Sequence, residues 1–321
     1  MKLALALAFG ALLCTQAFGS EYSALFKARK FAEVDRMAMA KLAQDPTNAD
    51  ALIARSEVIL ASGDGKLDDA IKFGEQCIAA HPNDSGCHLA YGNVLGAKAT
   101  SGGMMAAMNL AGKIRDAFKK SVELDPQNVE ARFSLLQYYM MAPAIAGGGA
   151  GKAHSLIEQT APINADVAKL LQARLDIAED KAATAETAAL AIKPGNEAVA
   201  DAQRDVLLNV ANKYLSDKKY PDAERVFREV QKRFPDIAYG LYGVGRVQQE
   251  QGKHKEAVAS FEQALATYSR PQAYYRLGQS LQALNDKAKA VAAYEKALAF
   301  KSGLSKKLHE DAEEQLKRLK S

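Results

Sequence analysis

The sequence predicts an all-α fold, an α-solenoid in which antiparallel helix pairs stack one after another. The strongest observation is an internal repeat, because a set of small and aromatic residues returns at a period of 33 or 34 positions. A second observation is the recurrence of proline where helices are expected to end. The third is the composition, 48% hydrophobic and 25% charged, which fits neither a disordered chain nor a multispan membrane protein.

Residues 1–19 predict a cleavable signal peptide. Lys2 provides the positive start, residues 3–13 form an apolar run too short to span a bilayer, and small residues stand at positions 17 and 19. We expect cleavage after Gly19 or Ala17, followed by export to the bacterial periplasm. An uncleaved anchor is the alternative, and no later stretch is apolar enough to predict a membrane span after leader cleavage.

Export would give the cysteines a role. Cys14 leaves with the leader, and its lipid modification is disfavoured because Leu13 stands where a small residue is required. Cys77 and Cys87 remain and flank the expected turn at 81–84, so they form either a disulfide or two buried free thiols. A bridge there would close a short loop and contribute roughly 2 to 3 kcal/mol. Two thiols alone do not favour a metal site.

Between residues 20 and 203 the repeat is degenerate, but its boundaries persist. Residues 45–51 and 125–131 are near copies of one boundary sequence, and Pro82, Pro162 and Pro194 occupy comparable junctions. The second helix of each pair is expected at 31–43, 66–80, 112–124, 151–161 and 182–192.

Residues 204–304 contain three well-matched repeats. Small residues at 211, 245 and 278 let the first helix approach its partner, and an aromatic residue on the second helix fills the next gap. The matched positions are Leu207, Val210, Ala211, Tyr214, Ala223, Phe227 and Pro235, then Leu241, Val244, Gly245, Gly252, Ala257, Phe261 and Ala264, then Tyr274, Leu277, Gly278, Leu281, Ala290, Tyr294 and Ala297.

This pattern resembles the tetratricopeptide repeat, in an exported bacterial protein. The resemblance implies a right-handed superhelical solenoid, in which we count about seven helix pairs. Residues 305–321 are predicted to form a C-terminal capping helix, since an apolar stripe faces one side and mixed charge covers the other. That stripe comprises Leu304, Leu308, Ala312, Leu316 and Leu319. Binding of this helix to a membrane surface is the disfavoured alternative.

Two insertions interrupt the array, near 98–112 and at 142–152. The glycine run of the second invites a phosphate-loop interpretation, but Ala146 and Ala153 stand where that motif needs glycine and serine or threonine. No strand precedes it, so a flexible interruption is the better prediction. Weak anion contact by Lys152 and His154 is a further alternative.

The methionines suggest a second interpretation of the insertions. Met105 and Met108 lie one helical turn apart, Met140 and Met141 are expected nearby, and thioethers are ligands for copper(I). Methionine in an apolar helix is more often core filler. The five histidines share no helix face, and no cofactor or metal site is predicted.

Neither catalysis nor nucleic-acid binding is predicted. No nucleophile motif or metalloprotease pattern occurs, so we expect no enzyme. The net charge of +4 is dispersed without a basic block, which argues against a nucleic-acid partner.

The resemblance places the partner on the concave side, which the first helices of the pairs line. Positions 2, 5, 9 and 12 of each repeat share one helix face. Tyrosine, arginine and amide side chains there suit an extended peptide, although an ordinary solvated face is the alternative. The candidate partner-binding residues are Asn209, Asn212, Tyr239, Tyr242, Arg246, Gln249, Gln272, Tyr275, Arg276 and Gln279.

Some cochaperones of this family grip a C-terminal carboxylate with a basic clamp. Its positions fall on Leu208, Asn212, Gly243, Gln272 and Arg276, and only Asn212 and Arg276 match. We therefore favour a non-enzymatic envelope adaptor that binds a protein or peptide in another way. The alternative is a periplasmic small-ligand or copper-binding protein that uses the two insertions.

Overall fold

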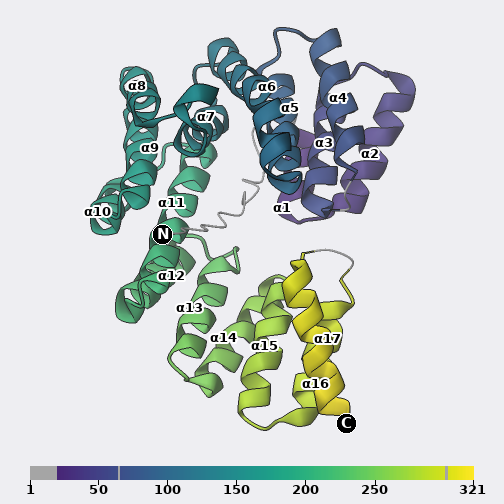
Figure 1. Ribbon diagram of the computed structural model, residues 1–321, viewed down its shortest axis with the longest axis vertical. Coiled ribbons are helices and arrows are strands. Elements are labelled where there is room, and N and C mark those ends of the chain that lie inside the picture. Colours follow the sequence, from purple (N-terminus) through teal and green to yellow (C-terminus); the bar gives the residue numbers. More distant parts are fainter. Residues whose placement is uncertain (1–19, 64–65, 301–302) are drawn as a thin grey trace. The chain divides into compact units, whose positions relative to one another are not determined.

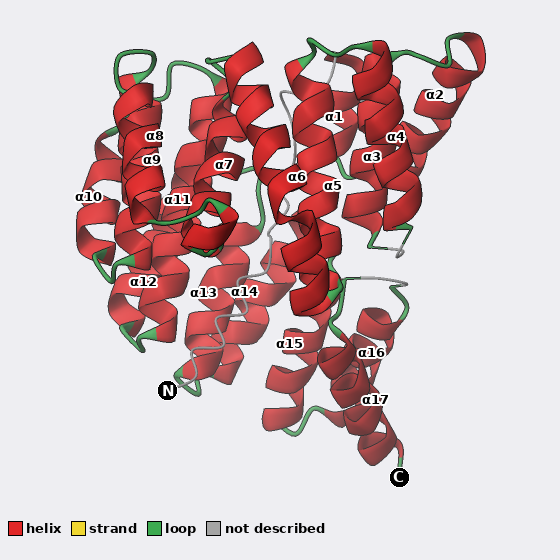
Figure 2. Ribbon diagram, turned by 45° about the horizontal axis from the view of Figure 1, so that its top comes forward, coloured by secondary structure: helices red, strands yellow, loops and turns green. Residues whose placement is uncertain are grey.

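The structure of the chain is a computed structural model that describes residues 20–63, 66–300 and 303–321. The expected leader, 1–19, lies outside the described residues. Within them the regular elements are helices and no strand occurs, as Figure 2 shows. None of the described helices is both long and apolar enough to pass through a membrane.

The all-α solenoid fold is confirmed, and the helices fall into two compact units (Figure 1). One unit contains the described residues up to Leu175 together with Pro194–Ala202, and the other contains Asp176–Lys193 and Gln203–Ser321. The first unit holds α1 Ser20–Lys27, α2 Phe31–Gln44, α3 Ala49–Ser62, α4 Leu67–Ala80, α5 Ser85–Ser101, α6 Gly103–Leu124, α7 Val129–Met141, the 3-10 helix η1 Ala144–Ala146 and α8 Ala150–Thr160.

Helices α9 Ala165–Ala178 and α11 Glu197–Ser216 cross the boundary between the units. The second unit continues with α10 Ala182–Ala191, α12 Tyr220–Arg233, α13 Tyr239–Glu250, α14 His254–Thr267, α15 Pro271–Ala283, α16 Lys287–Leu298 and α17 Lys306–Lys320. Taken two at a time in chain order, α1 to α16 make eight pairs among the described residues. This is one more than the seven or so expected, and α1 is the short first helix of the pair whose second helix was expected at 31–43.

The repeat boundaries are helix caps. Asn48, Asp84 and Asn128 each accept a hydrogen bond from the backbone N–H three residues ahead, at 2.9 to 3.1 Å. Such a cap satisfies one of the backbone donors that the first turn of a helix leaves unpaired. The near copies at 45–51 and 125–131 therefore end one helix and start the next by the same chemistry.

Small residues let the helices cross closely, as the repeats predicted. A Cβ atom placed on Gly245 would lie 2.6 Å from the ring of Phe261, and one on Gly92 would lie 2.5 Å from the ring of Phe118. Both rings are fully buried. The degenerate repeats of the first unit thus use the same glycine–aromatic packing as the well-matched repeats of the second.

Helix α17 seals the last pair, as predicted. Its Ala312 is fully buried in a cluster with Tyr294 and Ala297 of α16, and the apolar stripe of α17 packs around it. The residues of the stripe and the loop before it are Leu304, Leu308, Leu316 and Leu319. The contact covers an apolar helix surface that would otherwise face water.

The two insertions contain helical segments that belong to or contact neighbouring helices. The first lengthens α5 to 17 residues and α6 to 22, with the turn at Gly102 and Gly103. The second folds back on α7, where the Tyr138 hydroxyl donates to the Ala146 carbonyl at 2.6 Å. The Gly149 N–H donates to the Tyr139 carbonyl at 2.7 Å. These two hydrogen bonds tie the glycine run, which was expected to be a flexible interruption, to α7.

Candidate functional site

The predicted partner-binding residues lie on three helices of the second unit: α11 after Gln203, α13 and α15. The arginine of α13 links two of them, because Arg246 Nη1 donates to Asn212 Oδ1 of α11 at 2.6 Å. Its guanidinium carbon lies 5.9 Å from the ring centroid of Tyr242, in reach of a cation–π contact. Tyr242 in turn packs against the buried Phe261, with ring centroids 5.9 Å apart.

Arg270, which the sequence analysis missed, completes this cluster. Its guanidinium carbon lies 4.9 Å from the ring centroid of Tyr239 and 4.6 Å from that of Tyr242. Arg270 is the residue that precedes α15, outside the helical spacing used to select candidates, so periodicity could not find it. The two tyrosines stand one turn apart on α13, and that spacing was the only sequence signal for a cation above them.

The third arginine is held by an amide. Arg276 Nη1 donates to Gln249 Oε1 at 2.7 Å, while Gln249 Nε2 donates to the Arg276 carbonyl and to Ser280 Oγ, each at 2.9 Å. Glu250 Oε1 lies 3.7 Å from Arg276 Nη1, a loose ion pair with a half-exposed carboxylate. We call this surface the A-helix face, because it lies on the first (A) helices of three pairs and on the residue that precedes α15. It comprises Asn212, Tyr239, Tyr242, Arg246, Gln249, Arg270 and Arg276.

The A-helix face is positively charged. Burial lowers the pKa of the Arg246 guanidinium, and the nearby charges of Arg276 and Arg270 lower it further, while Tyr242 and Glu250 act in the opposite direction. An arginine stays protonated even so. The charges of Arg270 and Arg276 therefore act against that of Arg246 across a partly desolvated surface, and Glu250 forms its ion pair with Arg276.

The remaining candidates are engaged elsewhere. Tyr275 is only 6% exposed, and its hydroxyl donates to Asp311 Oδ2 of α17 at 2.6 Å. This hydrogen bond holds the capping helix α17 against α15. Gln279 donates to that same hydroxyl at 2.9 Å, and Gln272 donates to the Gly303 carbonyl. Asn209 turns back on its own helix and donates to the Asp205 carbonyl at 2.6 Å. These four residues stabilise the second unit rather than extend the A-helix face.

The structure brings Cys77 and Cys87 together. Cys77 of α4 and Cys87 of α5 form a disulfide, with Cα atoms 5.4 Å apart and both side chains buried. Their positions on either side of the turn between α4 and α5 make this geometry available. The sequence had left bridged and free thiols open.

The methionines of the first insertion are not core filler. Met104, Met105 and Met108 of α6 are 80%, 72% and 69% exposed. The copper(I) interpretation stays a prediction. Exposure makes these thioethers accessible as ligands, which is only one of the conditions for a copper(I) site. Among the described residues, no group of three or more histidine, cysteine, aspartate or glutamate side chains could hold a metal ion.

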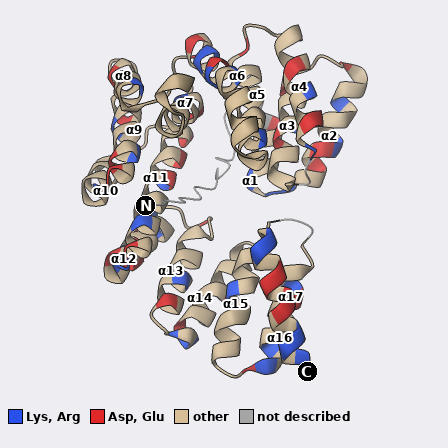
Figure 3. Ribbon diagram, viewed as in Figure 1, with Lys and Arg blue, Asp and Glu red and all other residues tan. Residues whose placement is uncertain are grey.

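Charges of both signs are interspersed over the helices (Figure 3). The local excess at the A-helix face stands out because it involves arginines alone, held next to aromatic rings.

Comparison with known proteins assigns the C-terminal part of the chain. Residues 211–269 and residues 242–305 each match the tetratricopeptide repeat family. Together the two matches cover residues 211–305. Such repeats generally mediate protein–protein interaction, and proteins of this fold are typically non-enzymatic scaffolds. No curated protein matches the chain.

Many solved structures are similar to the chain, and two of them are described here. One is a chain in the crystal structure of the APC/C hetero-tetramer Cut9–Hcn1, with 17% identity over 94% of this chain and 55% of that one, and a TM-score of 0.45. The chain thus spans about half the length of that relative. The other is a tetratricopeptide repeat protein from Parabacteroides merdae ATCC 43184, with 16% identity over 85% of this chain and 99% of that one, and a TM-score of 0.45.

Proposed function

We propose that this protein is a non-enzymatic adaptor whose A-helix face binds an acidic, extended segment of another protein. The observation that carries the proposal is the gathering of Arg246 and Arg270 beside the rings of Tyr239 and Tyr242, with Arg276 close enough for its charge to act on Arg246. Tetratricopeptide repeats bind proteins in general, and the charge of this surface specifies the chemistry of the partner.

Bound carboxylates would relieve the repulsion among the three arginines. Charge-assisted hydrogen bonds from a guanidinium to a carboxylate are short and strong, and arginine beside aromatic rings is enriched where interfaces bind most tightly. Asn212 and Gln249 already orient two of the guanidinium groups, at 2.6 and 2.7 Å. Less side-chain freedom is therefore lost when a partner binds.

The test uses a short labelled peptide in which glutamate alternates with leucine, and a copy in which every glutamate is glutamine. We expect the mature protein to bind the acidic peptide and to bind it more weakly as salt rises, because the contact is electrostatic. The Arg246→Gln, Arg270→Gln double variant should lose on the order of tenfold or more in affinity. Fluorescence anisotropy measures each of these values.

A matched control is available on α12. Arg228 is exposed and pairs with Glu224 on its own helix, so Arg228→Gln removes one arginine away from the face. It should leave peptide binding unchanged. Equal binding of the acidic and neutral peptides, or loss of binding in the Arg228 variant alone, would contradict the proposal. Replacing Tyr242 is a less clean test, since its ring also packs on the core Phe261.

We also propose that the protein works in the bacterial envelope. The signal-peptide pattern of residues 1–19 supports export, and the Cys77–Cys87 disulfide suits an oxidising compartment. Fractionation of cells should recover the protein from the periplasm, with a mature N-terminus at Ser20 or Phe18. A cytoplasmic protein that retains Met1 would exclude this compartment without affecting the peptide-binding test.

A further inference from the structure

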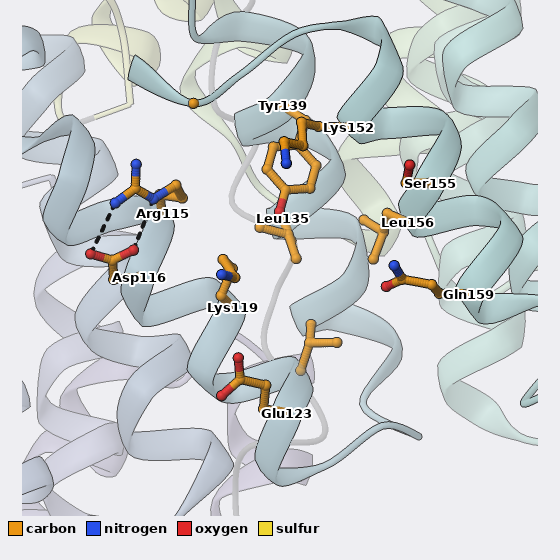
Figure 4. Close-up of a pocket in the computed structure, with 12 residues that line it drawn as sticks. Arg115, Asp116, Lys119, Glu123, Leu135, Tyr139, Lys152, Ser155, Leu156 and Gln159 are labelled. Atoms are coloured by element: carbon orange, nitrogen blue, oxygen red, sulfur yellow. Dashed lines mark hydrogen bonds and ion pairs between the residues drawn. The ribbon is translucent and has the colours of Figure 1, made fainter. Parts of the chain in front are cut away.

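The second insertion builds a cavity in the first unit. The cavity has a volume of about 560 Å³, within the range usual for small-molecule sites. It opens between α6 and α8, with α7 beneath it (Figure 4). Its lining consists of Arg115, Asp116, Lys119, Val122 and Glu123 of α6, Leu135 and Tyr139 of α7, Gly147, and Lys152, Ser155, Leu156 and Gln159 of α8.

The wall of this cavity is fixed by close packing. Gly147 has a positive φ of 85°, and a Cβ atom there would lie 2.9 Å from Arg115 Nη1. The turn that contains Gly147 therefore rests directly on the guanidinium group, and its positive φ favours glycine. The Tyr138 hydroxyl holds the preceding residue, Ala146, through its carbonyl. The insertion is thus a built element of the cavity.

The floor is apolar and the rim is cationic. Leu135, Leu156 and Tyr139 are buried beneath the cavity. Lys119 and Lys152 are both exposed at the rim, and neither forms an ion pair with any residue that the structure describes.

The other charges of the lining are neutralised. Arg115 forms two hydrogen bonds with Asp116, at 2.8 and 3.2 Å, and Glu123 lies 3.8 Å from Lys120 Nζ. The ammonium groups of Lys119 and Lys152 therefore stand above an apolar floor without an ion pair among the described residues, and the charge of Lys119 also helps to lower the pKa of the neighbouring Asp116.

A phosphate nest does not fit this geometry. Successive free backbone N–H groups would be needed, but those of Gly147, Gly148 and Gly149 already donate to the carbonyls of Ala144, Pro143 and Tyr139. The ammonium groups of Lys119 and Lys152 are the cationic donors that remain, and the apolar floor would leave an inorganic ion without contacts below.

We infer that this cavity binds a small organic carboxylate with an apolar body, with the carboxylate between Lys119 and Lys152 and the apolar part on Leu135, Tyr139 and Leu156. The apolar body gains free energy from burial against the floor, and the carboxylate is stabilised by two cations beside a low-dielectric surface. The site lies in the other unit from the A-helix face and does not depend on it.

The test is isothermal titration of the mature protein with decanoate, with the neutral chain of decanol and with inorganic phosphate. We expect decanoate to bind about one mole per mole, decanol to bind on the order of tenfold more weakly, and phosphate alone not to bind. The Lys119→Met, Lys152→Met double variant should lose most of the preference for decanoate over decanol. Both side chains are exposed, so the fold should be retained, which circular dichroism checks.

Lys113→Met is the matched control, because Lys113 is exposed on α6 and does not line the cavity. Its affinity for decanoate should equal that of the unaltered protein. Failure of decanoate to bind, equal affinity for decanol and decanoate, or an unchanged preference in the double lysine variant would each overturn the inference.

Discussion

At the scale of single residues, glycine in this chain has opposite roles in different helices. Gly245 lies where α13 crosses α14, and a Cβ atom there would lie 2.6 Å from the buried ring of Phe261. Gly112 lies inside α6, and a Cβ atom there would meet nothing within 4 Å. Gly245 therefore allows close packing between helices, whereas Gly112 only adds the conformational cost of glycine inside a helix.

Alanine at the two positions should therefore change stability in opposite directions. We expect Gly245→Ala to destabilise the protein by about 1 to 3 kcal/mol through overpacking, despite the better helix propensity of alanine. Gly112→Ala should stabilise it by about 0.5 to 1 kcal/mol. Urea unfolding measures both values, and a stabilising Gly245→Ala would show that the crossing of α13 and α14 is looser than described.

A second residue-scale prediction concerns alkaline pH. Burial, and a hydrogen bond from the Tyr214 hydroxyl to Glu186 Oε2 at 2.9 Å, raise the pKa of Tyr214 from 10.0 to about 12. Because the folded state holds this phenol protonated, its stabilisation is fully present below about pH 10. It should be lost as pH rises from about 10 through about 12.

Urea unfolding across this window should show a fall of about 2 kcal/mol from Tyr214. Burial also raises the pKa values of Tyr275 and Tyr294, which adds to the alkaline loss. The Tyr214→Phe variant lacks the titrating hydroxyl, so its stability should fall less steeply over the same range. A slope identical to that of the unaltered protein would rule out the assigned contribution.

At the scale of elements, the last helix protects the pair before it. Ala312 of α17 is fully buried against α16, and the Tyr275–Asp311 hydrogen bond ties α17 to α15. A terminal repeat without such a cap would expose apolar side chains to water.

Ala312→Asp should therefore undock α17, because it buries a carboxylate without a partner. We expect faster amide hydrogen exchange in α15 and α16 and a destabilisation of at least about 2 kcal/mol. Ala292→Asp places the same substitution on an exposed position of α16 and serves as the control. Similar exchange in both variants would mean that α17 does not contribute to the stability of its neighbours.

At the scale of the whole molecule, the described residues form two compact units, each made of helices that contact their neighbours in the chain. In such an array stability is approximately a sum of repeat and nearest-neighbour terms. A local defect is therefore expected to remain local.

This locality can be measured with a defect in the last repeat. Gly278→Val places side-chain atoms against the ring of Tyr294, where even a Cβ atom would lie 3.0 Å away. We expect amide exchange to accelerate in α15, α16 and α17 and to stay unchanged in α3 and α5. Acceleration throughout both units would indicate a single cooperative fold instead.

Much of the fold was predictable because it depends on local rules. The repeat period predicted that Gly245 and Phe261, like their counterparts, lie where two helices cross. The boundary sequences predicted the helix starts that Asn48 and Asn128 cap. Of the candidate site, the spacing found Tyr242, Arg246 and Gln249 on one face. It could not find Arg270, which reaches the tyrosines from a residue outside the periodic positions.

The sequence by itself determined the helices, their order and the pairs they form, because helix propensity, caps and apolar periodicity act over a few residues. Tertiary structure alone decided that Cys77 meets Cys87, that Tyr275 braces α17, and that the glycine run packs on Arg115. The division of the repeats at residue 203 stays a prediction. Contacts between side chains on different elements depend on how the helices pack against one another. The periodicity within one helix does not predict those contacts, because they also depend on the shapes of the other helices.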